Sequence, residues 1–276
     1  MSFINKSLNF HSTFQPQEIY LTKLLELAVN NYCGKKEEIS EITGIPTGKN
    51  TGKVVPHIKY LEHMGLINSE STTKGFKLSL TEIGRVVYEN DKFFDEKLTK
   101  LICHYYMTDY EIGAPQWIYL FKEYPAMLGI TIKNKNIQTK AEFMFNKEVD
   151  FAIAKNGYIP SKNGFFSCLN LLDADNENVE FKENYSNFEV FNFYGFSLLD
   201  LWQKYNKDAN EIILDKIIEE LKWNRIFGFT EEEMLNVFDE LQNIGIIKVN
   251  KQMRPISIQK LIDKEDLINE IYSNLI

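Results

Sequence analysis

The chain has 276 residues, 44% of them hydrophobic and 25% charged, which suits one large folded domain or two to three small ones. It has no run of about 18 apolar residues and no N-terminal segment of the signal-peptide type, so we expect a cytoplasmic protein without a membrane span. The net charge of -8 opposes nucleic-acid binding by the whole chain, because phosphate contacts dominate such binding.

The N-terminal residues favour three helices. Apolar residues at helical spacing predict a first helix over Pro16–Asn31 and a short second helix over Lys36–Ile42. A third helix is predicted over Lys53–Met64, with Gly65 as its C-terminal cap.

Two glycine–lysine pairs precede the third predicted helix and raise the question of a phosphate-binding loop. That motif needs four residues between its glycines and a Ser or Thr after the lysine. Only three residues separate Gly44 from Gly48, and neither Lys49 nor Lys53 is followed by a hydroxyl residue. We therefore predict that residues 44–52 form the long turn of a helix-turn-helix and hold no nucleotide.

A strand that begins at Leu66-Ile67, a turn over residues 71–75 and a returning strand over Phe76–Leu80 predict a hairpin. Three helices and a hairpin make a winged helix. Thr81 is the expected N-cap of the helix that follows.

The third helix of a winged helix on DNA presents its exposed face to the major groove. Residues 1–90 carry ten Lys and Arg against nine Asp and Glu, so this region can be locally basic on an acidic protein. A structural winged helix with ordinary solvated lysines fits the same pattern. The residues that we expect to contact DNA, through phosphates or base edges, are Lys49, Asn50, Lys53, His57, Lys59, Tyr60 and Lys74.

Residues 91–185 predict a helical middle region. Apolar spacing favours helices over Asp91–Met107, Ala114–Met127 and Ala141–Lys155, and a polar loop over Thr131–Lys140.

Short strands are expected at Val179–Phe181 and Phe188–Phe193, on either side of residue 185. The acidic turn before them starts like a calcium loop at Asp173. Asn178 and Asn184 stand where that loop requires a glycine and a carboxylate, so no calcium site is predicted.

The C-terminal region, residues 186–276, repeats part of the N-terminal pattern. HIKYLEHMGLI (His57–Ile67) aligns without a gap with VFDELQNIGII (Val237–Ile247), and a leucine, the glycine and an isoleucine coincide. We infer a second winged-helix-like unit. Asp239 and Glu240 on its corresponding face would repel phosphate, so this unit is expected to pack internally or to bind protein.

The predicted fold is therefore mainly α-helical, with a winged-helix-like unit at each end, a helical middle region and small β-hairpins. The expected domains are residues 1–90, 91–185 and 186–276.

Catalytic patterns are scarce. His57 and His63 are six residues apart, which is not a same-face spacing for metal ligands on a helix. Cys103 and His104 are adjacent, so on a helix they point about 100° apart and cannot act as nucleophile and base on that basis. We expect no catalytic residue, no metal ion and no cofactor.

Several phrases stand together along the first part of the chain. They are FHSTF (Phe10–Phe14), Gly48-Lys49-Asn50, Leu80-Thr81 with Gly84, DKFFDE (Asp91–Glu96), His104, and Trp117 with Phe121. These phrases resemble the bacterial family known as domain of unknown function 4007. The chain departs from the family pattern where Phe10 replaces a glycine, where extra residues follow Asn50, and where DKFFDE lacks a proline.

The resemblance implies a prokaryotic defence or DNA modification setting, beside a sulfurtransferase of the phosphoadenosine-phosphosulfate-reductase type as in DNA phosphorothioation clusters. It implies no reaction and carries over no catalytic residue. We expect a non-enzymatic DNA-binding or adaptor component of such a system, with double-stranded DNA and a sulfurtransferase or other modification-system proteins as partners. The alternatives are a protein–protein scaffold that never contacts DNA and, third, a small enzyme without a recognisable motif.

Overall fold

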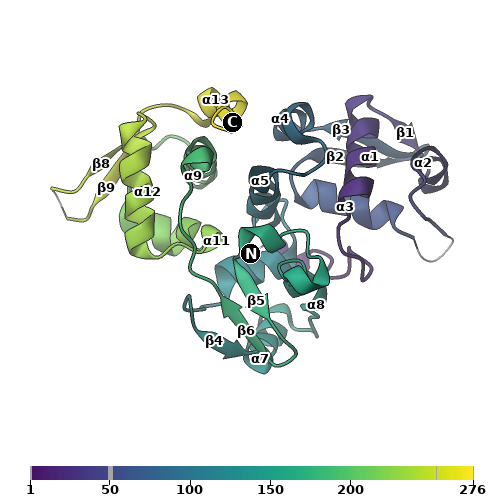
Figure 1. Ribbon diagram of the computed structural model, residues 1–276, viewed down its shortest axis with the longest axis horizontal. Coiled ribbons are helices and arrows are strands. Elements are labelled where there is room, and N and C mark those ends of the chain that lie inside the picture. The colour runs from purple at the N-terminus through teal and green to yellow at the C-terminus, as the bar shows by residue number, and fades with distance from the viewer. Residues whose placement is uncertain (1, 49–51, 253, 276) are drawn as a thin grey trace. The chain divides into compact units, whose positions relative to one another are not determined.

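The computed structural model describes residues 2–48, 52–252 and 254–275 (Figure 1). The fold is mainly α-helical with small three-stranded sheets, as the sequence predicted. Contacts divide the chain into two compact units. Unit 1 comprises Met1–Ala126 and Thr131–Glu180, and unit 2 comprises Met127–Ile130 and Phe181–Ile276. The three-domain division stays a prediction. None of the described helices is long and apolar enough to cross a membrane.

Unit 1 begins with the predicted three helices and hairpin. Its elements are α1 (Glu18–Val29), β1 (Cys33–Gly34), α2 (Lys36–Thr43), α3 (Val54–His63), β2 (Ile67–Thr72) and β3 (Gly75–Leu80). The strands form a sheet in the order β1-β3-β2, with Ile67 opposite Leu80 and Cys33 opposite Lys77. The sequence did not indicate β1, because two residues are too few to show a strand periodicity.

A glycine ends α3 and turns the chain into β2. Gly65 has φ 72°, and the N–H of Leu66 donates to the carbonyl of Leu61 over 2.9 Å. A side chain at Gly65 would be strained at this φ and would also meet the ring of Tyr106, 2.6 Å from the Cβ position. Gly65 therefore acts as the predicted helix cap.

The start of α4 (Glu82–Asp91) explains the Leu80-Thr81-x-x-Gly84 phrase. The Thr81 hydroxyl accepts from the N–H of Gly84 over 2.9 Å and donates to the carbonyl of Gly65 over 2.6 Å. A Cβ on Gly84 would lie 1.8 Å from the carbonyl oxygen of Leu66. The phrase thus joins α4 to the end of α3.

The DKFFDE phrase also has a structural role. The buried Asp91 carboxylate accepts hydrogen bonds from the N–H groups of Asp95 and Glu96, over 3.0 and 2.9 Å, and from the Thr99 hydroxyl over 2.5 Å. Phe94 has φ 62° within this turn. The turn splits the helix predicted over Asp91–Met107, so α5 begins only at Lys97.

The rest of unit 1 is helical around one small sheet. Its main elements are α5 (Lys97–Met107), α6 (Pro115–Ile118), the π-helix η2 (Tyr119–Glu123), β4 (Thr131–Lys133), α7 (Asn134–Phe145), α8 (Ala152–Asn156), β5 (Leu172–Ala174) and β6 (Asn178–Phe181). The loop predicted over Thr131–Lys140 is wrong, because these residues form β4 and the start of α7. The sheet has the order β4-β6-β5, with Thr131 opposite Glu180.

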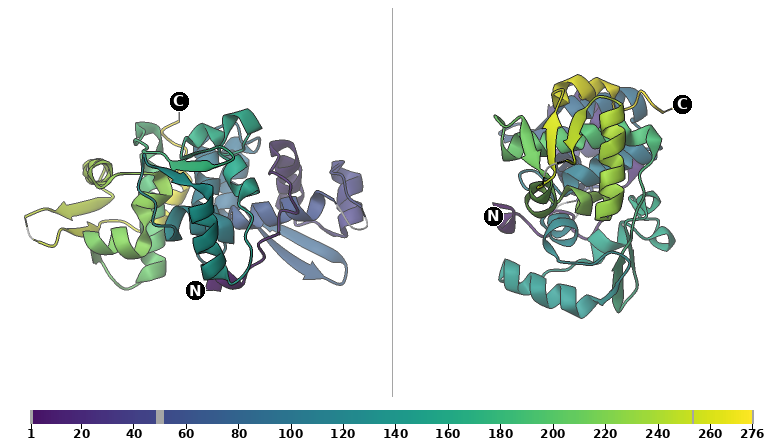
Figure 2. Two further views of the ribbon diagram at one scale, coloured as in Figure 1. Left: turned by 90° about the horizontal axis from the view of Figure 1, so that it is seen from below. Right: turned by 90° about the vertical axis from the view of Figure 1, so that its left-hand side faces the viewer.

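Unit 2 uses the same order of elements as the start of unit 1. It contains α9 (Phe191–Tyr205), β7 (Glu211–Ile213), α10 (Leu214–Lys216), η6 (Ile217–Leu221), α11 (Trp223–Phe227), α12 (Glu231–Asn243), β8 (Ile247–Asn250), β9 (Ser257–Lys260) and α13 (Lys264–Leu267). The strand order β7-β9-β8 corresponds to β1-β3-β2. Figure 2 shows α12 beside the β8–β9 hairpin. The strand predicted over Phe188–Phe193 is wrong, because α9 begins there.

The predicted repeat is confirmed as a helix, a left-handed glycine and a strand. Gly245 has φ 79°, the N–H of Ile246 donates to the carbonyl of Leu241 over 2.9 Å, and β8 begins at Ile247. These contacts match those of Gly65 and Leu66 after α3.

Gly84→Ala should destabilise the protein by about 2 kcal/mol or more, since the added methyl group overlaps the Leu66 carbonyl and well-packed sites resist such overpacking. Thr81→Ala should cost about 1 kcal/mol through the lost cap. Urea unfolding measures both, with the exposed Arg85→Ala of the same helix as control. Equal midpoints for Gly84→Ala and Arg85→Ala would contradict this account of the phrase.

Candidate nucleic-acid interface

The face of α3 that was expected to meet DNA is covered by two other segments of unit 1. The ring of Phe10 lies 5.0 Å from that of Tyr60 and 4.5 Å from that of His63, between centroids. The Tyr60 hydroxyl donates to the carbonyl of Phe14 over 2.8 Å, and Trp117 packs edge-on against the Tyr60 ring at 6.4 Å. The segment Phe10–Gln17 and the start of α6 therefore cover this face of α3 at His57 and Tyr60.

His57 is held inside this cover by both ring nitrogens. Nδ1 lies 2.7 Å from the carbonyl of Lys53 and must donate to it, while Nε2 accepts from the N–H of Gln17 over 3.2 Å. One donor and one acceptor define the neutral ring. Burial lowers the pKa of His57 to about 4. His57 is thus a neutral residue that connects α3 to the N-terminal segment.

Two of the residues that were expected to contact DNA are consequently buried. We predicted His57 and Tyr60 on the exposed face of the third helix, but the exposed fraction of both side chains is 0%. The prediction of their exposure is wrong, because helical periodicity could not show that Phe10, Phe14 and Trp117 cover this face.

The two lysines at α3 are accessible but already engaged. The Lys53 ammonium lies 5.5 and 5.3 Å from the ring centroids of Phe14 and Tyr20, which is within the range of a cation–π contact. Lys59 forms an ion pair with Glu62 over 2.6 Å. The Glu62 carboxylate therefore compensates part of the positive charge that Lys59 could offer to a phosphate.

The hairpin carries the most exposed of the expected cations. Lys74 lies in the turn between β2 and β3 and is exposed. Lys77, which we had not assigned, lies on β3 near Glu70, with 3.8 Å between nitrogen and oxygen. Lys49 and Asn50 lie outside the described residues. In the described part of the expected site, Lys53 and Lys74 are accessible cations. Neither forms an ion pair with a carboxylate of the described residues.

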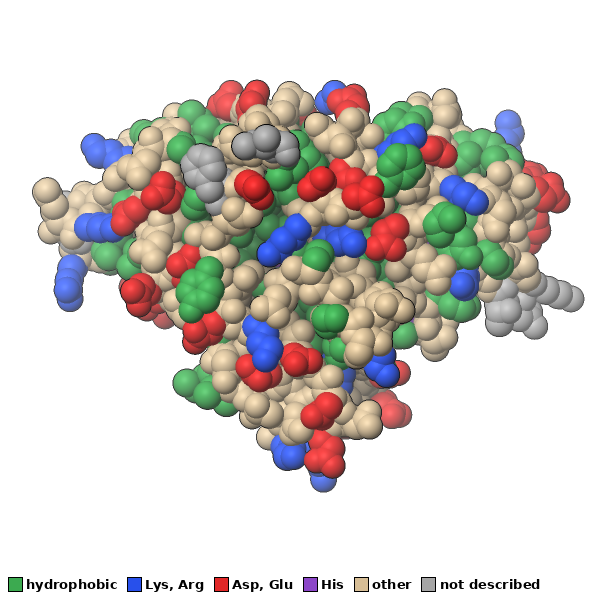
Figure 3. Space-filling model, in the orientation of Figure 1, with side chains coloured by type: hydrophobic (Ala, Val, Ile, Leu, Met, Phe, Trp, Pro, Cys, Tyr) green, Lys and Arg blue, Asp and Glu red, His purple; other side chains and the backbone are tan. Residues whose placement is uncertain are grey.

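Acidic side chains surround this area. The exposed Glu37, Glu38 and Glu41 belong to α2, directly before the turn that leads to α3. Figure 3 shows Lys and Arg side chains interspersed with Asp and Glu over the visible surface of both units. The visible surface therefore has no broad basic face of the kind that drives strong binding to duplex DNA.

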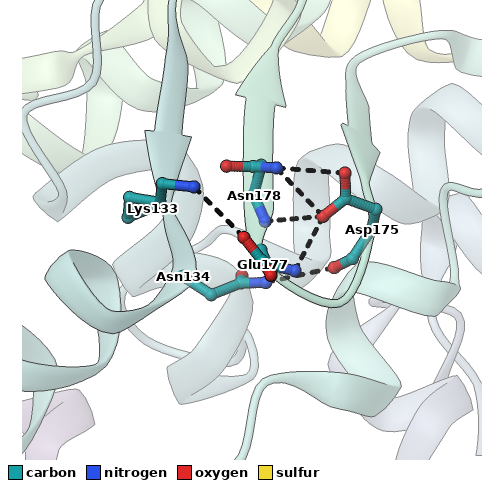
Figure 4. Close-up of polar contacts among 5 residues, drawn as sticks. All are labelled: Lys133, Asn134, Asp175, Glu177 and Asn178. Carbon is teal, nitrogen blue, oxygen red and sulfur yellow. Dashed lines mark hydrogen bonds and ion pairs between the residues drawn. The ribbon is translucent and has the colours of Figure 1, made fainter.

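The acidic turn after β5 is held by its own hydrogen bonds (Figure 4). One carboxylate oxygen of Asp175 accepts from the N–H groups of Glu177 and Asn178, both over 2.7 Å. Hydrogen bonds from the Asn178 side chain and from these backbone groups lower the pKa of Asp175. Lys133 pairs with Glu177 over 3.3 Å. Asp175 thus acts as a turn acceptor in a hairpin.

The described residues contain no group of three or more His, Cys, Asp or Glu side chains placed to hold a metal ion. Of the cysteines, Cys103 is buried, while Cys33 and Cys168 are exposed, and all three are free thiols. Burial raises the pKa of Cys103, which makes that thiol a poor nucleophile.

The model of a family described as "Protein of unknown function (DUF4007)" matches residues 9–273. Two solved structures are similar to the chain. "Magnesium ion-bound SspB crystal structure" has a TM-score of 0.81 at 16% identity, and "SspB crystal structure" has 0.79 at 15%. Each comparison covers 98% of this chain and 89% of the other. At this identity the likeness shows the fold alone. No curated protein matches the sequence.

Lowering the pH from 6.5 towards 4 should reduce the free energy of unfolding of the protein. Because the folded pKa of His57 is about 4, below its ordinary value of 6.5, the unfolded chain binds this proton more readily. The contribution of the neutral His57 to the free energy of unfolding is complete above pH 6.5. It is lost as the pH falls from 6.5 towards 4, at up to about 1.4 kcal/mol per pH unit. Urea unfolding at several pH values measures the effect.

His63, whose pKa burial also lowers to about 4, should contribute in the same direction. His57→Gln and His63→Gln should each reduce the pH dependence. Nitrogen NMR of the imidazoles provides the direct check, and a His57 ring that titrates near pH 6.5 in the folded protein would contradict its burial in neutral form.

Proposed function

The chain belongs to the DUF4007 family, as its phrases predicted, and we propose that it is a non-enzymatic adaptor of a prokaryotic DNA modification system of the phosphorothioation type or of an anti-phage system. The family resemblance supports the setting, and the fold likeness to SspB is consistent with it. Its protein partner would be a sulfurtransferase or another component of the modification system.

We also propose that both units contain a winged helix. The order helix, short strand, helix, helix and hairpin occurs in each, with the same strand order. In a winged helix the short strand pairs with the hairpin, as β1 and β7 do here. The element order supports this assignment, although α10, η6 and α11 together take the place of the single α2.

The burial of the α3 face is the observation on which the proposed mode of DNA contact rests. His57 and Tyr60 are used inside unit 1, so α3 has few side chains left to read base edges. The remaining cations can contact phosphate, and these are Lys53, Lys74 and, from the sequence, Lys49. Phosphate contacts carry no sequence information. The proposed contact with double-stranded DNA is therefore weak and independent of sequence.

A scaffold without DNA contact is the second candidate, and the same buried face favours it. In unit 2 the corresponding helix, α12, carries Asp239 and the exposed Glu240. Asp239 pairs with Lys251 over 2.7 Å, so its charge is partly compensated within the unit. On the scaffold hypothesis, both third helices serve packing and protein contacts.

The full-length chain should bind duplex DNA weakly, and the affinity should fall steeply with salt. About three phosphate contacts give a log–log salt slope of about -3. Lys53→Glu combined with Lys74→Glu should abolish the binding, because both reverse an accessible charge. Fluorescence anisotropy with a labelled duplex at three salt concentrations measures this. Two duplexes of unrelated sequence should bind equally.

Lys135→Glu provides a charge-matched control, since Lys135 is exposed on α7 of the same unit. Equal loss in this control would indicate a general charge effect. Absence of binding at low salt would sink the DNA contact and leave the scaffold. A supercoiled plasmid incubated with the protein and magnesium chloride tests the non-enzymatic assignment, and conversion of the plasmid to a relaxed or linear form would overturn it.

A further inference from the structure

The hairpin of β8 and β9 is a positively charged part of an acidic unit. Unit 2 carries eleven Lys and Arg against seventeen Asp and Glu. Residues 241–262, which span this hairpin, contain no Asp or Glu. They contain four cations, which are Lys248, Lys251, Arg254 and Lys260. Lys and Arg side chains accordingly lie over β8 and β9, at the left in Figure 3.

Two of these cations are available to a ligand. Lys248 and Arg254 are exposed, and neither forms an ion pair with a carboxylate of the described residues. Lys251 pairs with Asp239 of α12 over 2.7 Å, and both side chains are about half exposed. Exposed ion pairs contribute little free energy. Lys251 can therefore exchange this carboxylate for a phosphate at a small cost.

The hairpin is fixed against the rest of unit 2. The exposed fraction of Ile247 and of Ile258 is 0%, so both strands are anchored through their inner face. The N–H of Val249 donates to the side-chain oxygen of Gln242 on α12 over 2.8 Å. Lys248 therefore projects from a packed strand.

The outer face of the hairpin is polar. Lys248 lies opposite Gln259, and Asn250 lies opposite Ser257, on the face that is turned away from the buried isoleucines. Protein interfaces depend on aromatic or other apolar anchors, and these four outward residues supply none. Phosphate oxygens, by contrast, accept hydrogen bonds from Lys, Arg, Ser, Asn and Gln side chains. The composition of this face favours a nucleic-acid backbone over a protein partner.

Carboxylates limit the size of the contact. Lys260 pairs with Asp263 over 2.8 Å. The exposed Glu211 lies on β7, on the other side of β9 from β8. Glu240 is exposed on α12 and would repel a phosphate. A contact with nucleic acid is therefore confined to β8 and the turn that follows it.

We propose that this hairpin contacts the phosphate backbone of duplex DNA through Lys248, Lys251 and Arg254. The inference rests on the proposed contact with duplex DNA, and it adds a second place of contact in unit 2 to that of Lys53 and Lys74 in unit 1. Phosphate contacts carry no sequence information, so the hairpin adds affinity without adding a sequence preference.

Lys248→Gln combined with Arg254→Gln tests the contact in the full-length chain. Each phosphate contact contributes roughly -0.9 to the log–log salt slope, so two more contacts change the slope from about -3 for unit 1 alone to about -5. The variant should return to about -3. Between 50 and 200 mM salt, the affinity of the parent chain should therefore fall about tenfold more than that of the variant. Fluorescence anisotropy with a labelled duplex measures both slopes.

Lys182→Gln combined with Lys207→Gln is the matched control, because it removes two positive charges of unit 2 outside the hairpin. Its slope should equal that of the parent chain. Circular dichroism confirms that each variant is folded.

The failure of this inference differs from the failure of the unit 1 contact. If the parent chain and the hairpin variant share one slope, the hairpin contact is overturned and the unit 1 contact stands. If Lys53→Glu with Lys74→Glu leaves binding that the hairpin variant lacks, the reverse holds. Absence of duplex binding at low salt overturns both. Poly-L-glutamate that binds the parent chain more tightly than the duplex, and is lost by the hairpin variant, overturns the choice of nucleic acid in favour of an acidic protein segment.

Discussion

The cover over α3 is the interaction on which the organisation of unit 1 depends. His57 can bond to both Lys53 and Gln17 only as a neutral ring, and Tyr60 completes the connection through the carbonyl of Phe14. These bonds hold the N-terminal segment across a face of α3 that the sequence predicted to be exposed. The segment therefore buries the side chains of His57 and Tyr60.

The cover over α3 includes residues that follow position 90 in the chain. Trp117 packs on Tyr60, and Nδ1 of His63 lies 2.5 Å from the carbonyl oxygen of Ile112. Residues 1–90 therefore lack part of the surroundings of α3. In unit 1 the three N-terminal helices and the hairpin therefore pack against residues that follow them in the chain.

The two units use one order of elements for different surfaces. Unit 1 presents Lys53 and Lys74 near a covered helix, whereas unit 2 presents the exposed Glu240 on α12. The connection between first helix and edge strand differs as well, since α9 and β7 are joined by residues 206–210 and α1 and β1 by residues 30–32. The two units thus differ both in the charges that they expose and in the length of this connection.

The phrases that carried the family resemblance are mainly structural. Phe10 packs on α3, Thr81 and Gly84 start α4, and Asp91 caps the turn before α5. In this chain these residues make hydrogen bonds or close contacts within the fold. They therefore predicted the family correctly without indicating a reaction.

The sequence by itself determined the local elements of this protein. Helical spacing, the glycines at positions 65 and 245 and the Thr81 cap placed three N-terminal helices, a hairpin and a repeat, because each depends on neighbours within a few residues. Only the tertiary structure decided that Phe191 starts a helix, that β1 joins a sheet, and that α3 is covered. These outcomes depend on contacts between segments far apart in the chain, such as that of Phe10 with Tyr60, and periodicity along one helix shows that a face is apolar or polar but not what packs against it.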